Sequence, residues 1–237
     1  MKKTVEALTL VCLMAVPGLV LAQPSWDFSA SLFGARVWYS NTDVRISDSS
    51  VNSDLTAHDV KLDNGTSFGG KLEAWNTTLR GATGMDFGLG LDVTRLRTKT
   101  KEQQVILTGR VGTFPVSQVG TLAASDAHTT AAAFNVVVRR PFGVSSESPY
   151  GTWYPYLGAG AGKSKTELSS GGNSGTDTAG ITQFFGGVNV FVSKSWALFA
   201  EYKHVRTASQ TFMLGTQKDE IPATTANQVA VGAAFHF

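Results

Sequence analysis

Residues 85–97, MDFGLGLDVTRLR, alternate between large apolar side chains and small or polar ones. In an extended chain one face carries Phe87, Leu89, Leu91 and Val93, and the other carries Gly88, Gly90, Asp92 and Thr94. A period of two predicts a β-strand with one apolar face. The side chains on the opposite face are unusually small, and the reason must lie in what this face packs against.

The same alternation occurs in eight segments of about ten residues, separated by Gly-, Ser-, Thr-, Asn- and Asp-rich stretches. We predict strands at residues 26–39, 67–76, 85–97, 129–139, 153–163 and 181–193, around 196–203, and at the end of the chain. In the first of them the phase changes near Phe33, which predicts a bulge or an exit from the apolar zone.

The connections alternate between long and short along the chain. Residues 40–66, 98–128 and 164–180 and the roughly 20 residues before the last strand form long connections, whereas residues 77–84, 140–152 and 194–195 form short ones. An even strand count with short turns at one rim and long loops at the other is typical of an outer-membrane barrel, and a soluble sandwich has no reason to show it. We therefore predict an all-β, antiparallel up-and-down transmembrane barrel with short periplasmic turns and long extracellular loops.

Tryptophan positions support this orientation independently. Trp38 falls near the long-loop rim, and the short-turn rim is expected to carry an aromatic girdle formed by Trp26, Trp75, Trp153 and Trp196.

Composition excludes several other classes. Hydrophobic residues make up 42% of the 237 residues and charged residues only 16%, which argues against a disordered chain. The formal charge is +2, and the basic residues are scattered rather than gathered on one face, so nucleic acid is not an expected partner. A barrel accounts for the near-neutral hydropathy, because only half of each strand faces lipid.

The first 22 residues have the composition of a secretory signal peptide. Two lysines precede an apolar stretch, and Val20 and Ala22 are suitable for cleavage before residue 23. A membrane anchor is a less suitable interpretation because the apolar stretch is short. Cys12 is not preceded by a small residue, which argues against a lipoprotein. We expect residues 1–22 to be the leader and residues 23–237 to be the barrel domain, which then contains no cysteine.

Six charged residues fall on the predicted lumen face, three of each sign. They are Lys71, Glu73, Asp92, Arg139, Glu201 and Lys203. An eight-stranded barrel is just wide enough for side chains to fill it, and lumen glycines leave room for long polar residues opposite. We interpret the six charges as a paired network that plugs the barrel, since unpaired charges there are costly. A gated ion path is the alternative interpretation.

The end of the chain, Gly232-Ala233-Ala234-Phe235-His236-Phe237, resembles the terminal signal of outer-membrane proteins. Together with residues 154–162, 88–93 and 196–203, it resembles the OmpA-like and opacity-protein-like small barrels of Gram-negative bacteria, over the whole mature chain. The resemblance implies an outer-membrane location, contact with membrane lipid and lipopolysaccharide, and recognition of Gly232, Phe235 and Phe237 by the barrel assembly machinery. Larger OmpA relatives add a peptidoglycan-binding domain, a role that is not carried over here.

Catalytic and metal-binding patterns are weak. Lipid A deacylases resemble barrels with a His-x-Ser pair on one strand, but the residue two positions after His204 is Arg206. The first long loop contains five aspartates in a spacing that matches no EF-hand, namely Asp43, Asp48, Asp54, Asp59 and Asp63. We expect no catalytic residue, cofactor or metal.

Two points stay open at this level. Residues 103–122 contain enough apolar residues for a hairpin, which we expect to extend the third and fourth strands above the membrane; two further spanning strands would instead give a ten-stranded barrel. The function is predicted to be that of a non-enzymatic surface protein that supports the envelope or binds host or neighbouring cells through its loops. The alternative is a small pore for small or hydrophobic solutes, and a lipid A-modifying enzyme is a distant third.

Overall fold

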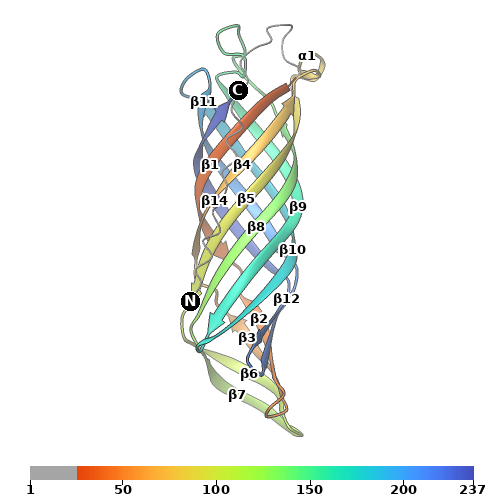
Figure 1. Cartoon of the computed structure of the whole chain (residues 1–237), viewed down its shortest axis with the longest axis vertical. Helices are drawn as coiled ribbons and strands as arrows, with labels where there is room; N and C mark the ends of the chain where they lie inside the picture. The colour runs from red at the N-terminus through yellow and green to blue at the C-terminus, as the bar shows by residue number, and fades with distance from the viewer. Residues whose placement is uncertain (1–25) are drawn as a thin grey trace, which may run out of the picture.

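The computed structural model describes residues 26–237, so the predicted signal peptide lies outside the described residues. Eight antiparallel strands form a closed barrel in the order β1-β14-β11-β10-β9-β8-β5-β4 (Figure 1). Its strands are β1 (Trp26–Tyr39), β4 (Gly65–Asn76), β5 (Asp86–Thr100), β8 (Ser125–Arg139), β9 (Trp153–Ser170), β10 (Asn173–Phe191), β11 (Trp196–Thr207) and β14 (Thr224–His236). The predicted eight-stranded barrel is therefore confirmed.

Closure comes from pairing between the first and last strands. β1 pairs with β14 on one side and with β4 on the other, and its register against β4 continues without interruption from Trp26 to Val37. Of the two alternatives predicted near Phe33, a bulge or an exit from the apolar zone, the bulge is therefore wrong. Instead Phe33 and Val37 are buried while Arg36 is exposed, so the apolar side chains of β1 change face without a change in backbone register.

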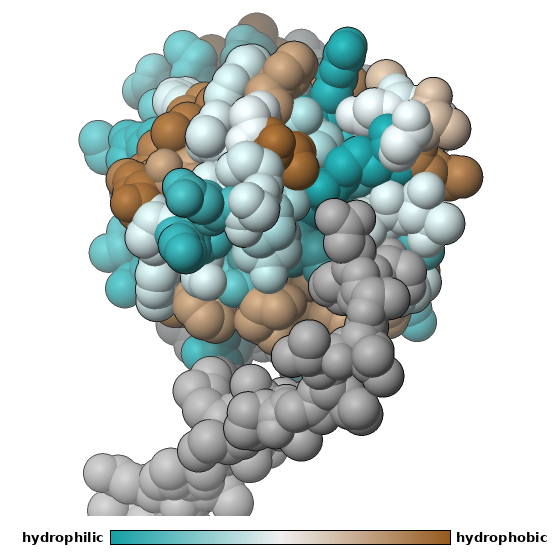
Figure 2. Space-filling model, turned by 90° about the horizontal axis from the view of Figure 1, so that it is seen from above, coloured by the Kyte–Doolittle hydropathy of each residue, from teal (hydrophilic) through white to brown (hydrophobic). Residues whose placement is uncertain are grey.

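The two faces of each strand differ as the alternation predicts. On β5, Phe87 and Leu89 are exposed on the outer wall, whereas Asp86 and Asp92 are buried inside. Seen from the short-turn end, the surface is a mixture of hydrophilic and hydrophobic residues, and several of the hydrophobic ones lie at the circumference (Figure 2). Within the described residues, no α-helix has the length and hydropathy needed to cross a membrane. The short helix α1 (Arg80–Thr83) lies in the turn between β4 and β5 and ends at Gly84, whose φ is 71°.

The long connections form a second sheet beyond the barrel. Its strands are β2 (Thr42–Asp48), β3 (Ser53–Val60), β6 (Gln103–Val111), β7 (Phe114–Leu122), β12 (Gln210–Leu214) and β13 (Gln217–Ile221), in the order β12-β13-β2-β3-β6-β7. Residues 103–122 do form a hairpin, but β6 pairs with β3 in this loop sheet. The ten-stranded alternative is thus excluded, and the hairpin is part of a joint structure rather than a simple extension of β5 and β8.

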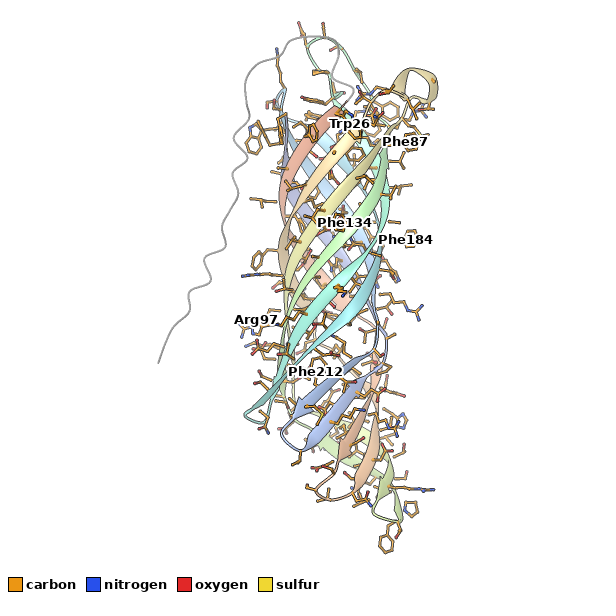
Figure 3. The ribbon with its side chains drawn as sticks, turned by 45° about the vertical axis from the view of Figure 1, so that its right-hand side comes forward. Trp26, Phe87, Arg97, Phe134, Phe184 and Phe212 are labelled. Atoms are coloured by element: carbon orange, nitrogen blue, oxygen red, sulfur yellow. The ribbon has the colours of Figure 1, made fainter. Side chains whose placement is uncertain are left out.

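Two small apolar clusters hold the loop sheet together and attach it to the barrel. Val44, Ala57, Val60 and Val105 pack within the sheet. Phe212, which Figure 3 shows beside the loop-side end of the barrel, packs with Leu214 and with Leu168 of β9. The backbone N–H of Thr211 also donates to Asp177 Oδ2 on β10 at 2.7 Å. The loop sheet is therefore anchored to the barrel by packing and by hydrogen bonds.

One predicted loop proved to be continuous strand. Residues 164–180 extend β9 to Ser170 and start β10 at Asn173, joined at Gly171 and Gly172, whose φ angles are 58° and 83°. Two consecutive residues with positive φ form a tight hairpin turn that suits the twist of the strands. The sequence signal was missing because this part of the hairpin lacks an apolar face, although its backbone ladder is complete.

Asp219 gives the loop sheet a testable pH dependence. Burial raises the pKa of this carboxyl above its usual value, against the lowering effect of a hydrogen bond from Gln217. A raised folded-state pKa means that the associated stability is present at low pH and is lost as pH rises through that pKa. We expect Asp219→Asn to raise the protection of the β13 and β2 amides against hydrogen exchange at pH 7. We also expect their protection factors, which are corrected for the intrinsic exchange rate, to change less between pH 4 and 7 than in wild type.

The partly exposed neighbour Glu220 provides the control, since Glu220→Gln leaves the buried carboxyl in place. The pKa of Asp54 is shifted in the opposite direction to that of Asp219, because the Arg45 side chain holds the pKa of the Asp54 carboxyl below its usual value. Stability associated with Asp54 is therefore lost as pH falls, not as it rises. Faster exchange in the Asp219→Asn protein, or an equal effect of Glu220→Gln, would contradict the assignment.

Candidate functional site

The barrel lumen contains several buried charged groups. Lys71 on β4, Asp92 on β5, and Glu201 and Lys203 on β11 all occupy inward positions and are buried. Burial of single charges costs several kcal/mol, which makes their partners decisive. These four residues form the central cluster of the lumen.

Opposite charges are matched within the central cluster. Lys71 pairs with Glu201, and Lys203 pairs with Asp92. A second oxygen of Glu201 lies 3.7 Å from Lys203 Nζ, so the four groups are linked in a row. The Tyr156 hydroxyl donates to Glu201 at 2.9 Å. The cluster is therefore neutral in charge and connected by hydrogen bonds.

Aromatic rings enclose the two lysines of the central cluster. Lys71 Nζ lies 4.9 Å from the ring centre of Phe185 and 5.6 Å from those of Phe33 and Phe199. Lys203 Nζ lies 5.3 Å from the Phe33 ring centre. Ammonium groups are attracted to ring faces, most strongly where water is excluded. The three rings both fill the lumen and stabilise the buried cations.

Lumen glycines make room for these rings. A Cβ at Gly232 would lie 2.7 Å from the Phe199 ring, and one at Gly158 would lie 2.3 Å from the Phe185 ring. We expected the glycines to accommodate long polar side chains, whereas at these two positions the space is taken by phenylalanine. Filling of a narrow barrel by side chains of unequal size is the physical reason in both cases.

A second cluster, centred on Arg139, lies nearer the short-turn end. Its guanidinium pairs with Asp27 and donates from Nε to Asp86 Oδ2 at 2.8 Å. The guanidinium carbon lies 4.5 Å from the Trp75 ring centre and 4.8 Å from that of Tyr154. Arg139 is thus held by two carboxylates and lies close to the faces of two aromatic rings.

Further residues complete the Arg139 cluster. Arg80 donates to both oxygens of Asp86, at 2.7 and 2.6 Å, and so binds that carboxylate from the rim. His236 Nδ1 lies 3.2 Å from both oxygens of Asp27, and its Nε2 lies 3.0 Å from the Tyr154 hydroxyl. This links the last strand of the barrel to the first through side chains as well as through the backbone.

The six charges expected in one network are divided between these clusters. Lys71, Asp92, Glu201 and Lys203 lie in the central cluster, and Arg139 lies in the other. Glu73 is half-buried and accepts a hydrogen bond from Ser29 at 3.3 Å, and among the described residues it makes no ion pair. Asp27, Asp86 and His236 were missing from the prediction, although their inward positions follow from the same alternation.

The tryptophans differ in one position from the expected girdle. Trp26, Trp153 and Trp196 are 41–52% exposed at the short-turn end, where Figure 3 labels Trp26. Trp75 is fully buried and packs against Arg139 inside the barrel, so its assignment to the girdle is wrong. The physical reason is strand parity, because Trp75 shares a face with Lys71 and Glu73.

The expected assembly residues occupy the closing seam. Phe235 packs against Trp196, with 5.1 Å between ring centres, and the Phe237 backbone N–H donates to Phe28 O at 3.0 Å. Gly232 lies opposite Phe33 on β1 and Phe199 on β11. Each of the three residues therefore has a structural position at the junction of the first and last strands.

Two histidines lie near the loop end of the barrel strands. His204 on β11 is exposed, and its Nδ1 lies 2.8 Å from Asn227 Oδ1. The second is His128 on β8, two residues before Thr130. His128 Nε2 lies 3.5 Å from Asp126. Over residues 26–237, no three His, Cys, Asp or Glu side chains are grouped as metal ligands.

A family model described as outer membrane protein beta-barrel domain matches residues 8–237. No curated protein matches the chain.

Among solved structures, Neisserial surface protein A is similar, with 14% identity, a TM-score of 0.43, and coverage of 89% of this chain and 97% of that one. Ail of Yersinia pestis shows 15% identity, a TM-score of 0.42 and coverage of 89% and 98%. OprG of Pseudomonas aeruginosa shows 13% identity, a TM-score of 0.44 and coverage of 89% and 95%.

Proposed function

This chain belongs to the outer-membrane β-barrel proteins and is located in the outer membrane. We propose that it is a closed, non-enzymatic barrel that displays its loop sheet at the cell surface. The observation that carries the proposal is the neutralised pair of charge clusters inside the lumen. An eight-stranded barrel filled in this way is an anchor rather than a passage.

The lumen contents argue against ion passage. A hydrated ion would have to separate Lys71 from Glu201 and Lys203 from Asp92, and each separation leaves a charge buried without its partner. The rings of Phe33, Phe185 and Phe199 surround the two lysines and occupy space that a hydrated ion would need. Wide, water-filled lumens of porins lack this combination.

The loop sheet supports the display part of the proposal. Three long connections contribute strands to it, and a shared sheet holds a binding surface in a more fixed shape than separate flexible loops do. The β6–β7 hairpin exposes Ile106, Phe114 and Val119, of which Phe114 is 75% exposed. Exposed apolar side chains on a polar surface are typical of interaction sites. We assign this hairpin to contact with a host or neighbouring cell.

A variant without the hairpin tests both parts of the proposal. Gln103–Leu122 would be replaced by a short Asn-Gly-containing turn, which leaves all eight barrel strands in place. We expect wild type and variant to be equally silent in planar bilayers, and we expect only wild type to bind cells when displayed on a non-adherent bacterium. Heat-modifiable migration in detergent gels checks that both barrels are folded.

A small pore is the competing function, and conductance separates the two. If wild type shows stable single-channel openings that change with Glu201→Gln or Arg139→Gln, the protein is a pore and the closed-barrel proposal is wrong. Cell binding that survives removal of the hairpin would contradict its role in adhesion. Release of fatty acid from lipid A by the purified protein, lost in His204→Ala or His128→Ala, would contradict the non-enzymatic assignment.

We further propose that the terminal strand acts as the assembly signal, read by the barrel assembly machinery through Phe235 and Phe237. Both rings are exposed in part on the outer wall, which makes them accessible before the barrel closes. The exposed tryptophans at the same end, Trp26, Trp153 and Trp196, are assigned to the membrane interface.

A further inference from the structure

The hairpin of β6 and β7 ends in a group of exposed apolar side chains. Val111 and Phe114 pair across its turn, and they are 39% and 75% exposed. Pro115, the next residue of β7, is exposed as well. We call Val111, Phe114 and Pro115 the apolar tip. In Figure 1 this hairpin reaches farther from the short-turn end than any other labelled strand does.

A neighbouring turn braces the apolar tip. The backbone N–H of Gly112 donates to Asn52 O at 2.9 Å, and so joins the β6–β7 turn to the turn between β2 and β3. That second turn is held by Asp48, whose Oδ1 accepts from the backbone N–H of Ser50 at 2.8 Å. Val51, in the same turn, is 58% exposed. The apolar side chains are therefore presented on a connected backbone.

The apolar tip does not contribute to the core of the loop sheet. The side chains that hold this sheet together are Val44, Ala57, Val60 and Val105, and the tip residues are not among them or packed against them. Single exposed apolar residues are common on protein surfaces, whereas a group of adjacent ones at a projecting end is typical of a contact site. The apolar tip is thus available for a partner outside the protein.

Charges near the apolar tip balance one another. Arg110 is exposed and lies opposite Asp54 of β3 in the strand register. Asp54 accepts hydrogen bonds from Arg45 on both of its oxygens, at 2.8 and 2.5 Å. With Asp48 of the neighbouring turn, the local set has as many anions as cations. Apolar area, rather than net charge, is therefore what this end of the protein offers to a partner.

The apolar tip points away from the membrane that holds the barrel. β6 has nine residues, which is about 30 Å of extended strand, and it begins beyond Thr100, where β5 ends. Figure 3 shows Phe134 and Phe184 on the barrel wall, Phe212 at the loop-side end, and the loop sheet beyond it. A surface reached by the tip therefore belongs to another cell.

The size and shape of the tip favour a lipid surface over a protein. A stable protein interface uses about 20–30 residues on each side, whereas residues 49–52 and 111–115 are far fewer. A protein would also have to supply a pocket for the projecting Phe114 ring. A bilayer accepts apolar side chains from a convex tip, and binding grows with the apolar area that enters it. The exposed hydroxyls of Ser49 and Thr113 suit the headgroup layer.

We propose that the apolar tip inserts into the outer leaflet of an apposed membrane that presents zwitterionic phospholipid. Val111, Phe114 and Pro115 enter the boundary of the acyl chains, and Ser49 and Thr113 stay among the headgroups. The inference rests on the proposed display function and names the partner as lipid. One tip binds weakly, and many copies on one cell surface together give a firm contact.

Flotation with protein-free phosphatidylcholine vesicles tests the proposal. The purified chain would be held in nanodiscs, so that the barrel is already in lipid and the loop sheet is free, and vesicle lipid would be titrated into the millimolar range. We expect wild-type nanodiscs to float with the vesicles. Phe114→Asn is expected to lower the partition constant about tenfold, because removing a phenyl ring from water contributes about that factor. The matched control is Met213→Asn, which changes a 56% exposed apolar side chain on β12 of the same sheet and is expected to bind as wild type does.

A fluorescent label measures the insertion directly. Cys12 is the only cysteine of the chain and lies in the predicted leader, so one introduced cysteine can be labelled with an environment-sensitive dye. With Thr113→Cys we expect a blue shift on vesicle binding and quenching by lipid with brominated acyl chains. With Gln118→Cys, farther along β7, we expect neither. Binding is expected to be equal at about 0.1 M and about 0.5 M salt, because no net charge contributes to it.

Three results would each overturn the insertion: no flotation of wild type, equal losses in Phe114→Asn and Met213→Asn, or a dye at residue 113 that stays in water. Heat-modifiable migration verifies that the variants are folded. The proposed display function fails separately. If the protein without Gln103–Leu122 loses cell binding while wild type does not bind vesicles, display stands and its partner is not lipid. If that variant still binds cells, the display role of the hairpin is wrong even where vesicles bind.

Discussion

Arg139→Met is expected to lower the free energy of unfolding by about 3–5 kcal/mol, the usual cost of removing one partner from a buried ion pair. Asp27 and Asp86 would both lose the cation that lies between them. Arg80 still contacts Asp86 and His236 still contacts Asp27, so the carboxylates keep one partner each. Methionine fills much of the space between Trp75 and Tyr154, which isolates the loss of charge from the loss of volume.

The measurement is urea unfolding in lipid vesicles, followed by heat-modifiable migration and tryptophan fluorescence. Arg140→Met serves as the control, because Arg140 is adjacent in sequence but exposed, with its guanidinium near the Phe142 ring. If the two variants unfold at the same urea concentration, the Arg139 cluster does not stabilise the barrel.

Glu201→Gln is expected to be destabilising by about 3 kcal/mol or more, since it leaves the buried Lys71 without its carboxylate. Lys203 keeps Asp92, so Lys71 is the cation that is left unpaired. The double variant Lys71→Met/Glu201→Gln removes the unpaired charge and is expected to recover most of the loss. Residues in contact show non-additive effects, and a double-mutant cycle measures them.

Unfolding of wild type, both single variants and the double variant completes the cycle. Glu147→Gln is the matched control, because Glu147 is exposed in the connection between β8 and β9. Additive losses in the double variant would show that Lys71 and Glu201 act separately, and the interpretation of the central cluster as a coupled plug would then be wrong.

The period-two alternation of side chains was enough to predict most of the charged residues that face the lumen. A period of two put Lys71, Asp92, Arg139, Glu201 and Lys203 on inward faces, and all five are buried. The same rule applies to Asp27, Asp86 and His236, which an inspection of inward positions near the strand ends would have found. Trp75 was misassigned because its place along the strand was considered without its parity.

Pairing partners were beyond the reach of the sequence. Asp27 and His236 are 209 positions apart and meet only because the barrel closes. Phe33, Phe185 and Phe199 come from three strands and surround Lys71 only at one particular register and shear. Strand existence follows from local chemistry, whereas these contacts depend on how the whole sheet is rolled up.

The loop sheet was missed for a related reason. Its strands are short, and β13 pairs with β2 although the two are separated by most of the chain. Residues 164–180, which extend the barrel strands β9 and β10, were missed as strands because they lack an apolar face and so show no pattern of burial. Loops that fold against one another leave little trace in local sequence.

The pairing of β13 with β2, and of β3 with β6, has a consequence for how this surface can diversify. Exposed loops that do not pair with one another accept insertions and substitutions one at a time. Here a change in residues 45–48 has to remain compatible with residues 217–220, which lie in a different loop. Variation among natural relatives should therefore be concentrated in the tips at residues 49–52 and 112–113, while the paired segments change together.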